Sequence, residues 1–412
     1  MSRLQEVFGS AEPPYQYTHS LGRRKVKLVR KGGTNLPTVY QIDTKMVVVF
    51  PRPWYHGAMV VCYTGGGTLG HVYPALAVHE QMLESPAYEA FWIGRNNARE
   101  KAVVEAAGLS FFPIRSGKLR RYRSMRNVLD IGNIVLGFFQ ALGILSRHRP
   151  DVLFSKGGFV SVPPVLAAFV LRIPVVSHES DTTAGLATRI NAHFSRTVCV
   201  SHDQGFDTLP ASKLFVSGNP VRKALVEQAK HKETLERPDF LADGEPLVLV
   251  LGGSSGSAEI NDLVRNTVDA IAKKAFIYHQ CGREDGQETA TERYRKVPFI
   301  DTELARLLAH ATVVVSRAGA GTLAELALFG CACLLIPLSS AYSRGDQVEN
   351  AQRLANAGAA RVLYGDESDG SFAEALLGLL EDEQARTSMG KALGASADWD
   401  SAKRIAHVLM QI

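Results

Sequence analysis

Short apolar runs recur along the first half of the chain and alternate with stretches that have the hydrophobic period of a helix. Strands separated by helices in this way are typical of right-handed βαβ units, which build a parallel sheet. The pattern therefore predicts an α/β fold, with strands near residues 59–63, 90–94, 152–155, 174–177, 197–200 and 214–217.

The same alternation starts again in the second half, after Gly218-Asn219-Pro220 and a charged stretch at 230–246. Each series opens with a strand followed by a glycine-rich turn, so we expect two Rossmann-like halves joined near residue 220. Their strand ends would face one another across a cleft that binds ligands. Strands of the second half are predicted near residues 246–251, 275–278, 312–315 and 333–336.

Residues 1–57 lack a sustained hydrophobic period, because prolines, paired glycines and a basic run interrupt it. We expect a poorly defined extension that is loosely attached to the rest. The first strand begins at Met59, so a start codon assigned too early is an alternative explanation. The expected division is an extension at 1–57, Rossmann-like domains at 58–220 and 221–397, and a C-terminal helix at 398–412 that packs back on the N-terminal domain.

Composition and charge narrow the functional class only a little. With 46% apolar and 21% charged residues, the 412-residue chain is an ordinary soluble protein long enough for two domains. A net charge of +5 indicates attraction to anionic partners without choosing among phosphates, nucleic acid and lipid. The five cysteines are scattered and mostly lie in apolar runs, which argues against disulfides or zinc and favours a reducing cytoplasm. No secretory signal is predicted.

Three glycine-rich turns follow predicted strands and open helices. Glycine lets the backbone approach a ligand closely, and a helix N-terminus presents unpaired N–H groups to negative charge. We interpret the turns as binding sites for a phosphate or a sugar, although the tightness of a βα turn alone also explains glycine there. They lie at residues 64–71, 252–256 and 316–322.

Side chains suited to transfer chemistry accompany these turns. His71 in the first turn is the candidate general base. Ser254 in the second turn suits a phosphate, or alternatively caps the next helix. Glu325, one turn into the helix after the third turn, is placed to accept hydrogen bonds from ribose hydroxyls, with a solvated carboxylate as the alternative. Gln347 and Asn350 share a helical face, and amides suit sugar hydroxyls.

Six cationic residues gather between positions 115 and 126, with apolar residues interleaved. A solvated surface is the ordinary explanation, but this composition also describes a segment that attaches to an anionic membrane surface or grips a lipid pyrophosphate. We interpret the segment as membrane-binding. The longest apolar stretch, residues 128–145, is too short and polar to predict a membrane span.

A metal site has little support. The only Asp-x-Asp triplet, Asp398-Trp399-Asp400, precedes the final helical pattern rather than following a strand, so helix capping is expected there. The sequence therefore predicts neither a metal nor a cofactor.

Several separated motifs, in this order along the chain, resemble the MurG family of bacterial glycosyltransferases. The resemblance covers roughly residues 59–412 and rests on motifs that are specific in combination. The matching segments are residues 66–71, 155–163, 178–181, 218–222, 252–254, 298–301 and 316–325.

The resemblance implies a GT-B fold, in which two facing Rossmann-like domains enclose a deep interdomain cleft. It also implies an inverting hexosyltransferase that moves N-acetylglucosamine from UDP-N-acetylglucosamine to the C4 hydroxyl of the N-acetylmuramoyl unit of lipid I, giving lipid II for peptidoglycan synthesis. Lipid I, undecaprenyl-pyrophosphoryl-N-acetylmuramoyl-pentapeptide, would bind the N-terminal domain and the nucleotide sugar mostly the C-terminal one. The expected location is peripheral, on the cytoplasmic face of the bacterial cell membrane, with no nucleic-acid partner.

Carried over position by position, the resemblance also implies which residues contact the substrates. Arg222 and Ser254 would serve the diphosphate, and the backbone of Ile300 would hold uracil. Glu325 would bind the ribose and Gln347 the sugar hydroxyls. The full set of expected substrate contacts is Thr68, Leu69, Gly70, Asp181, Arg222, Ser254, Ile300, Arg317, Gly319, Ala320, Gly321, Thr322, Glu325, Gln347 and Asn350.

The chain departs from the family pattern at two of these positions. Leu69 stands where the family usually has glycine, and Asp181 where it usually has asparagine. A side chain at 69 would hinder close backbone approach, and a carboxylate at 181 would repel the diphosphate but accept from hydroxyls. We interpret both as lineage variation. The alternatives are a GT-B transferase with another lipid acceptor, and a UDP-sugar-binding regulator that has lost catalysis.

Overall fold

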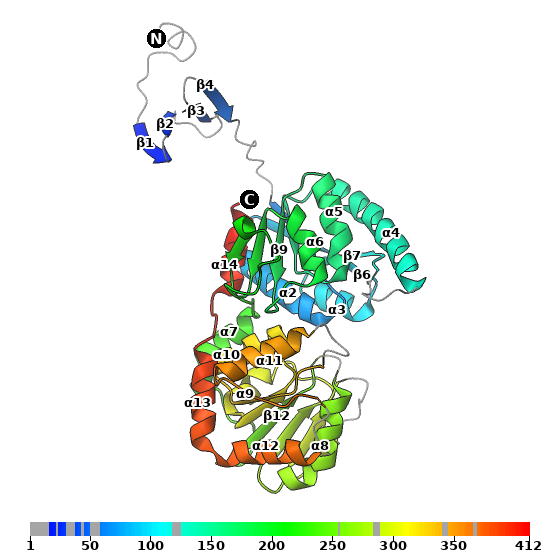
Figure 1. The fold of residues 1–412 in the computed structure, drawn as a ribbon, viewed down its shortest axis with the longest axis vertical. Coiled ribbons are helices and arrows are strands. Elements are labelled where there is room, and N and C mark those ends of the chain that lie inside the picture. The colour runs from blue at the N-terminus through cyan, green and yellow to red at the C-terminus, as the bar shows by residue number, and fades with distance from the viewer. Residues whose placement is uncertain are drawn as a thin grey trace. The chain divides into compact units, whose positions relative to one another are not determined.

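The computed structural model describes residues 16–21, 24–29, 38–42, 45–49, 58–117, 125–253, 256–282, 289–339, 345–365 and 369–412. The chain forms two compact units, Met1–Ala58 and Met59–Ile412. Figure 1 shows the helices and strands of both units.

The first unit contains a four-stranded antiparallel sheet in the order β1-β2-β3-β4. Each strand pairs with its neighbour along the chain, so the sheet is a meander. The sequence predicted no element here, because alternation of polar and apolar residues is short; in β2 it covers only positions 25–28. The strands are Gln16–Leu21 (β1), Arg24–Val29 (β2), Thr38–Ile42 (β3) and Lys45–Val49 (β4).

The second unit begins with a seven-stranded parallel sheet in the order β11-β10-β9-β8-β5-β6-β7, and we call this sheet with its helices the N-terminal lobe. The strands are Met59–Thr64 (β5), Tyr88–Arg95 (β6), Ser110–Ile114 (β7), Val152–Ser155 (β8), Val175–Glu179 (β9), Thr197–Val200 (β10) and Leu214–Val216 (β11). Its helices are Leu69–Met82 (α2), Ala98–Ala106 (α3), Met125–His148 (α4), Val162–Val170 (α5) and Leu186–Phe194 (α6).

A second seven-stranded sheet follows in the order β14-β15-β13-β12-β16-β17-β18, and we call it with its helices the C-terminal lobe. All its pairs are parallel except β14 with β15. The strands are Leu247–Leu251 (β12), Phe276–Gln280 (β13), Thr289–Thr291 (β14), Tyr294–Val297 (β15), Val313–Ser316 (β16), Cys333–Leu335 (β17) and Arg361–Val362 (β18). The helices are Lys223–Lys230 (α7), Ala258–Ile271 (α8), Leu304–His310 (α9), Ala320–Phe329 (α10), Asp346–Asn356 (α11), Asp369–Glu381 (α12), Glu383–Gly394 (α13) and Ser401–Met410 (α14).

Helices cover both faces of each sheet, because successive side chains of a strand point to opposite faces. In β5, Val61 and Tyr63 pack with α2 and α14, whereas Cys62 packs with α4 and α5. In β12 the odd positions face α7, α9 and α10, and Val248 and Val250 face α8 and α12. Each lobe is thus a three-layer α/β/α unit, and the predicted α/β class is confirmed.

Four strands of the second unit lie where the sequence predicted none: β7, β14, β15 and β18. The last of these has only two residues and ends its sheet. The strand β7 contains Pro113, which lacks a backbone N–H donor and is tolerated because β7 is the last strand of its sheet. The strands β14 and β15 are a short antiparallel pair at the edge of the second sheet, where few residues are buried. Edge strands carry a weaker hydrophobic pattern than the central strands that the sequence revealed.

The chain crosses between the lobes twice, and the two crossings are bonded to each other. The first crossing precedes α7, and the second leads into α14, which packs on α2 of the N-terminal lobe. Ser401 Oγ donates to the Asn219 carbonyl at 2.9 Å. Arg404 Nη2 donates to the Ser217 carbonyl at 2.9 Å. The last helix therefore belongs to the core of the lobe where the second unit starts.

Replacing Leu409 tests how much of that core α14 supplies. Leu409 is completely buried among residues of β5 and α2, so Leu409→Ala is expected to lower the free energy of unfolding by about 2 to 5 kcal/mol. Met410, on the same helix, is 51% exposed, and Met410→Ala is expected to change the free energy of unfolding by less than about 0.5 kcal/mol. Urea unfolding of both variants measures the difference. Equal effects would show that α14 does not pack as described.

Candidate functional site

The first glycine turn is shaped by its own packing. Gly66 and Gly67 have φ angles of 142° and 98°, which favour glycine over other residues. The backbone N–H of Gly67 donates to Glu100 Oε1 at 2.8 Å. A Cβ on Gly67 would lie 2.7 Å from Cε1 of Phe159. These two glycines are therefore required by the protein itself, independently of any ligand.

The residues after these glycines form the start of α2. Thr68, the N-cap, and Gly70 are exposed, and His71 is half-buried. Leu69 is only 7% exposed and packs in the hydrophobic core of the N-terminal lobe. Its side chain therefore points away from the exposed surface of the turn, and only its backbone is available to a ligand. The hindrance expected from this departure does not arise.

A second loop, Lys156-Gly157-Gly158, follows β8 and lies against the first turn. Lys156 N donates to the Thr64 carbonyl at 2.8 Å. A Cβ on Gly158 would clash with the Gly66 carbonyl and would lie 3.3 Å from Nε2 of His71. The two loops follow β5 and β8, the neighbouring strands at which the strand order reverses, where α/β sheets bind ligands. This second loop lies in the segment 155–163 that resembles the MurG family, but no role in binding or catalysis was predicted for it from the sequence.

Glu179, at the end of β9, holds the loop that carries Asp181. Its two carboxylate oxygens accept the backbone N–H groups of Ser180 at 3.0 Å, Asp181 at 3.3 Å and Gly185 at 3.0 Å. Burial raises the pKa of Asp181 to about 7; the carboxylates of Glu179 and Asp346 add to the rise and Lys156 opposes it. Asp181 thus changes charge near neutral pH.

Asn350 on α11 connects the two lobes. Its Oδ1 accepts from the Thr182 hydroxyl at 2.6 Å and the Thr182 N–H at 3.3 Å. Its Nδ2 donates to the Ala318 carbonyl at 3.1 Å and approaches Asp181 Oδ1 at 3.4 Å. The amide expected to bind substrate is therefore occupied by protein groups in this structure. Gln347, on the same helix, likewise accepts the Leu338 N–H at 3.0 Å.

Arg222, which precedes α7, lies among groups from both lobes. Its guanidinium is 3.7 Å from Asp301 Oδ1 and 4.0 Å from Glu325 Oε1, and it lies 5.1 Å above the ring of Tyr73 on α2. Burial raises the pKa of Glu325 to about 7, against the opposing charge of Arg222. The structure thus brings two of the expected substrate residues, Arg222 and Glu325, together.

The third glycine turn leads into α10 and is open. Gly319 is the N-cap, and the first turn of the helix contains Ala320, Gly321 and Thr322. A Cβ on Gly319 or Gly321 would meet no protein atom within 4 Å. Neither glycine is required by packing, which distinguishes this turn from the first. An open helix N-terminus without side chains suits the close approach of an anion.

Two further predicted residues are held by protein partners. Arg317 pairs with Glu259 Oε2 at 2.6 Å and donates to the Ile336 carbonyl at 3.0 Å, so it ties together the ends of two strands. The backbone N–H of Ile300 donates to Gln280 Oε1 at 2.9 Å. Gln280 was not singled out from the sequence, although a polar residue ending a buried strand is the signal that would have found it.

Some predictions fall outside the described residues. Ser254 is one of them, as are positions 118–124 of the basic segment. Their roles stay predictions.

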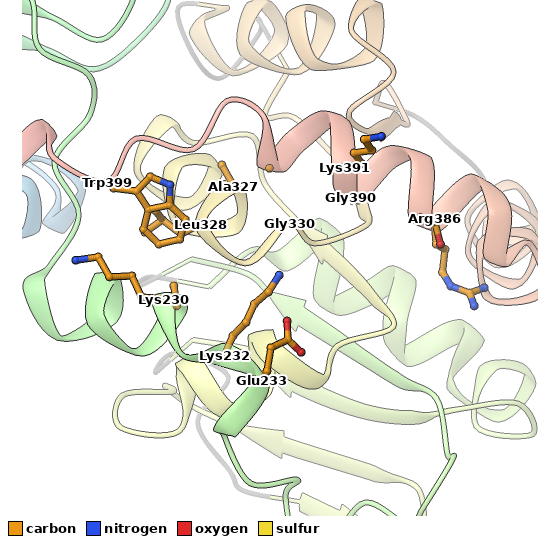
Figure 2. Close-up of a pocket in the computed structure, with 13 residues that line it drawn as sticks. Lys230, Lys232, Glu233, Ala327, Leu328, Gly330, Arg386, Gly390, Lys391 and Trp399 are labelled. Atoms are coloured by element: carbon orange, nitrogen blue, oxygen red, sulfur yellow. The ribbon is translucent and has the colours of Figure 1, made fainter.

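A cavity of about 660 Å³ opens on the C-terminal lobe, and none of the predicted site residues lines it (Figure 2). Cations line it, and two of them cap the C-termini of helices. Lys232 Nζ donates to the Phe329 carbonyl at the end of α10 at 2.7 Å, and Arg386 donates to the Leu379 carbonyl in the last turn of α12 at 2.7 Å. Two of the cations are therefore used in helix capping, and the cavity contains none of the residues of the candidate site.

Comparisons with known proteins bear on the whole of the second unit. The sequence model described as glycosyltransferase family 28 N-terminal domain matches residues 61–200, and that of the glycosyltransferase family 28 C-terminal domain matches residues 247–405.

Two relatives carry the name UDP-N-acetylglucosamine--N-acetylmuramyl-(pentapeptide) pyrophosphoryl-undecaprenol N-acetylglucosamine transferase. The protein of Treponema pallidum (strain Nichols) is 39% identical over 369 residues, which covers 84% of this chain and 95% of that protein. The protein of Clostridium botulinum (strain Hall) is 40% identical over 309 residues, covering 74% and 86%.

Solved structures share the fold at lower identity. MurG of Acinetobacter baumannii has a TM-score of 0.65 and 23% identity, covering 86% of this chain and all of that chain. A UDP-GlcNAc 2-epimerase from Neisseria meningitidis, bound to UDP-GlcNAc, has a TM-score of 0.59 and 15% identity, covering 86% and 100%. The expected GT-B fold is confirmed.

The open turn at α10 generates a prediction that separates stability from binding. Gly321→Ala is expected to keep or raise the free energy of unfolding, by up to about 1 kcal/mol, because alanine favours the helix. It is expected to weaken UDP binding about tenfold or more, because the methyl group occupies the space that a diphosphate needs. Calorimetric titration with UDP measures the affinity.

Gly143 on α4 provides the matched control, since a Cβ there also meets no atom within 4 Å. Gly143→Ala is expected to leave UDP affinity unchanged. If both variants bound UDP like the unaltered protein, α10 would not be the diphosphate site.

Proposed function

This chain belongs to glycosyltransferase family 28, and on that premise we propose that it transfers N-acetylglucosamine from UDP-N-acetylglucosamine to the C4 hydroxyl of the N-acetylmuramoyl unit of lipid I. The observation that carries the proposal is the identity with named transferases over nearly their whole length. The product is lipid II, the precursor of peptidoglycan.

The donor diphosphate binds at the N-terminus of α10, where unpaired N–H groups and the helix dipole favour negative charge. Arg222 adds a cation, since its present contacts with Asp301 and Glu325 are long enough to be exchanged for phosphate oxygens. The carboxylate of Glu325 then accepts hydrogen bonds from the ribose hydroxyls. The backbone carbonyl of Ile300 accepts a hydrogen bond from an N–H of uracil, because the backbone N–H of Ile300 is already bonded to Gln280.

His71 acts as the general base for the acceptor hydroxyl. Its position at the start of α2 is supported by Gly158, which leaves room for the imidazole ring. As the hydroxyl oxygen attacks the anomeric carbon, His71 takes its proton, and UDP leaves with its charge stabilised at α10 and Arg222. Direct displacement inverts the configuration at that carbon.

Gln347 and Asn350 bind the sugar hydroxyls by exchanging their present partners for substrate groups. For Asn350 these partners are Thr182 in the other lobe and Ala318. Donor binding is thereby coupled to the contact between the lobes.

Transfer of labelled N-acetylglucosamine to a lipid I analogue tests the function. The unaltered protein is expected to label lipid I and not a diacylglycerol acceptor. Binding of the UDP-sugar without any transfer would instead support a regulator, and labelling of the other acceptor would support a different transferase.

His71→Ala is expected to lower turnover in this assay by about 10²- to 10⁴-fold, the usual contribution of a general base. The control is His407→Ala on α14, whose ring bonds to Gln411 and which is expected to keep normal turnover. Unchanged turnover of His71→Ala would remove it as the base.

We further propose that the protein binds an anionic membrane surface through the basic segment 115–126 and the adjoining face of α4. Four apolar side chains on α4 are 49% to 61% exposed and spaced so that they share one face; they are Ile131, Val135, Leu136 and Phe139. No helix within the described ranges has the length and apolarity to cross a bilayer. A basic segment that is followed along the chain by an exposed apolar helix face suits shallow insertion among anionic lipids, where the polyprenyl tail of lipid I also lies. The proposed location is the cytoplasmic face of the bacterial cell membrane, where the nucleotide sugar is available.

Phe139→Ser is expected to weaken binding to phosphatidylglycerol-containing vesicles about thirtyfold, because a large apolar side chain that becomes buried in the lipid contributes about 2 kcal/mol. Leu83→Ser is the control, since Leu83 is 60% exposed at the end of α2. Vesicle sedimentation measures both. Equal losses in the two variants would contradict docking through α4.

A further inference from the structure

A lysine that no role has been assigned to lies buried beside the candidate site. Lys156 follows β8 and is only 1% exposed. Its ammonium donates to the Ser180 hydroxyl at 2.6 Å, and that hydroxyl donates to Asn219 Oδ1 at 2.9 Å. Removing an ammonium from water is costly unless nearby groups balance its charge. The surroundings of Lys156 must therefore supply negative charge.

Two carboxyl groups supply it. Burial lowers the pKa of Lys156, and the charges of Glu179 and Asp181 oppose that effect. Glu179 is committed to three backbone N–H groups of its own loop. Asp181 is not fixed in this way, and among the described residues its side chain makes only the long contact with Asn350. The charge of Asp181 is therefore the adjustable part of this group.

The groups that face Asp181 come from three elements. Glu179 belongs to β9, Lys156 follows β8, and Asp346 with Asn350 belongs to α11. His178 adjoins Lys156, and burial together with that ammonium lowers the pKa of His178 well below its usual value, so the imidazole stays neutral. Lys156 is thus the cation that offsets Asp181.

Lys156 also contacts the turn that carries His71. Its backbone N–H bonds to Thr64, and its Cβ would lie 3.2 Å from a Cβ placed on Gly65. Through Ser180, its side chain holds the loop that carries Asp181. One residue therefore fixes both the turn of the proposed base and the loop beside the reacting sugar.

We propose that Lys156 is a positioning residue for the transfer reaction, holding the 180–182 loop and favouring the ionised form of Asp181, which orients a substrate sugar by accepting from a hydroxyl other than the attacking one. The proposal rests on the proposed function. An ionised Asp181 accepts the hydrogen bond of that hydroxyl, as the amide oxygen of asparagine would, and Lys156 limits the repulsion of the donor diphosphate. The lysine thereby makes a carboxylate usable where the resemblance implies an amide.

The test is the pH dependence of kcat/KM for four proteins: unaltered, Lys156→Met, Asp181→Asn and the double variant. The unaltered protein is expected to lose activity as the pH falls through about 7, because Asp181 becomes protonated. Lys156→Met is expected to move that loss to higher pH by at least about one unit, because the ammonium no longer favours the carboxylate. The Asp181→Asn variant should lack the part of this loss that protonation of Asp181 causes and keep the part caused by protonation of the base, and adding Lys156→Met to it should change its profile little.

Lys156→Gln keeps a hydrogen-bond donor for Ser180 and removes the charge, so the loss of kcat/KM is expected to move to higher pH as in Lys156→Met. This variant replaces Lys156→Met in the test if Lys156→Met does not fold. Lys213→Met is the matched control, because Lys213 bonds to the Ala192 and His193 carbonyls of the same lobe. It should leave the pH profile unchanged. A profile of Lys156→Gln that parallels the unaltered protein would overturn the proposal.

Thermal unfolding gives a readout that needs no substrate. Folding raises the pKa of Asp181 from an ordinary value near 4 to about 7, so the folded chain holds a proton that the unfolded chain releases. This contribution to stability is full below about pH 4 and is lost as the pH rises to about 7. The Tm of the unaltered protein relative to Asp181→Asn should fall across that window, and Lys156→Gln should extend the fall to higher pH. If this pH dependence of Tm is observed but no N-acetylglucosamine is transferred to lipid I, the proposed function fails while the coupling of Lys156 to Asp181 stands. If transfer occurs but this pH dependence of Tm is absent, the coupling is overturned.

Discussion

The whole arrangement depends on the burial of parallel strands on both faces. Helices cover each sheet on two sides, so side chains along the central strands must be apolar in both directions. Polar groups are then admitted mainly where strands end. Lys156, Glu179 and Gln280 all stand at or just after a strand's carboxyl end. The candidate site lies there because this is where a three-layer lobe tolerates charge.

The two lobes use the same architecture for different purposes. In the N-terminal lobe the glycine turn is closed by packing against Glu100 and Phe159, which fixes the position of His71. In the C-terminal lobe the turn at α10 is open. A closed turn suits a group that must be held in place for proton transfer, and an open one suits a phosphate that comes and goes.

Much of the fold could be predicted from the sequence, because central strands form long apolar runs between glycine turns. The strands β7, β14, β15 and β18 and the N-terminal meander could not, since edge strands and local hairpin pairing leave a weak pattern. The sequence predicted which residues belong to the candidate site, but not which protein groups they bond to. Asn350 meets Thr182 across 168 positions, and no local spacing encodes that contact. The burial of Lys156 likewise follows from tertiary packing alone.

The paired crossings between the lobes limit how the protein can move. Both connections run side by side and are bonded through Ser401 to Asn219 and Arg404 to Ser217. Two adjacent attachments prevent free translation or twisting and leave rotation about one axis near them. Contacts that lie away from that axis then separate most in such a rotation. Through these bonds the C-terminal helix helps to set the axis about which the lobes can rotate.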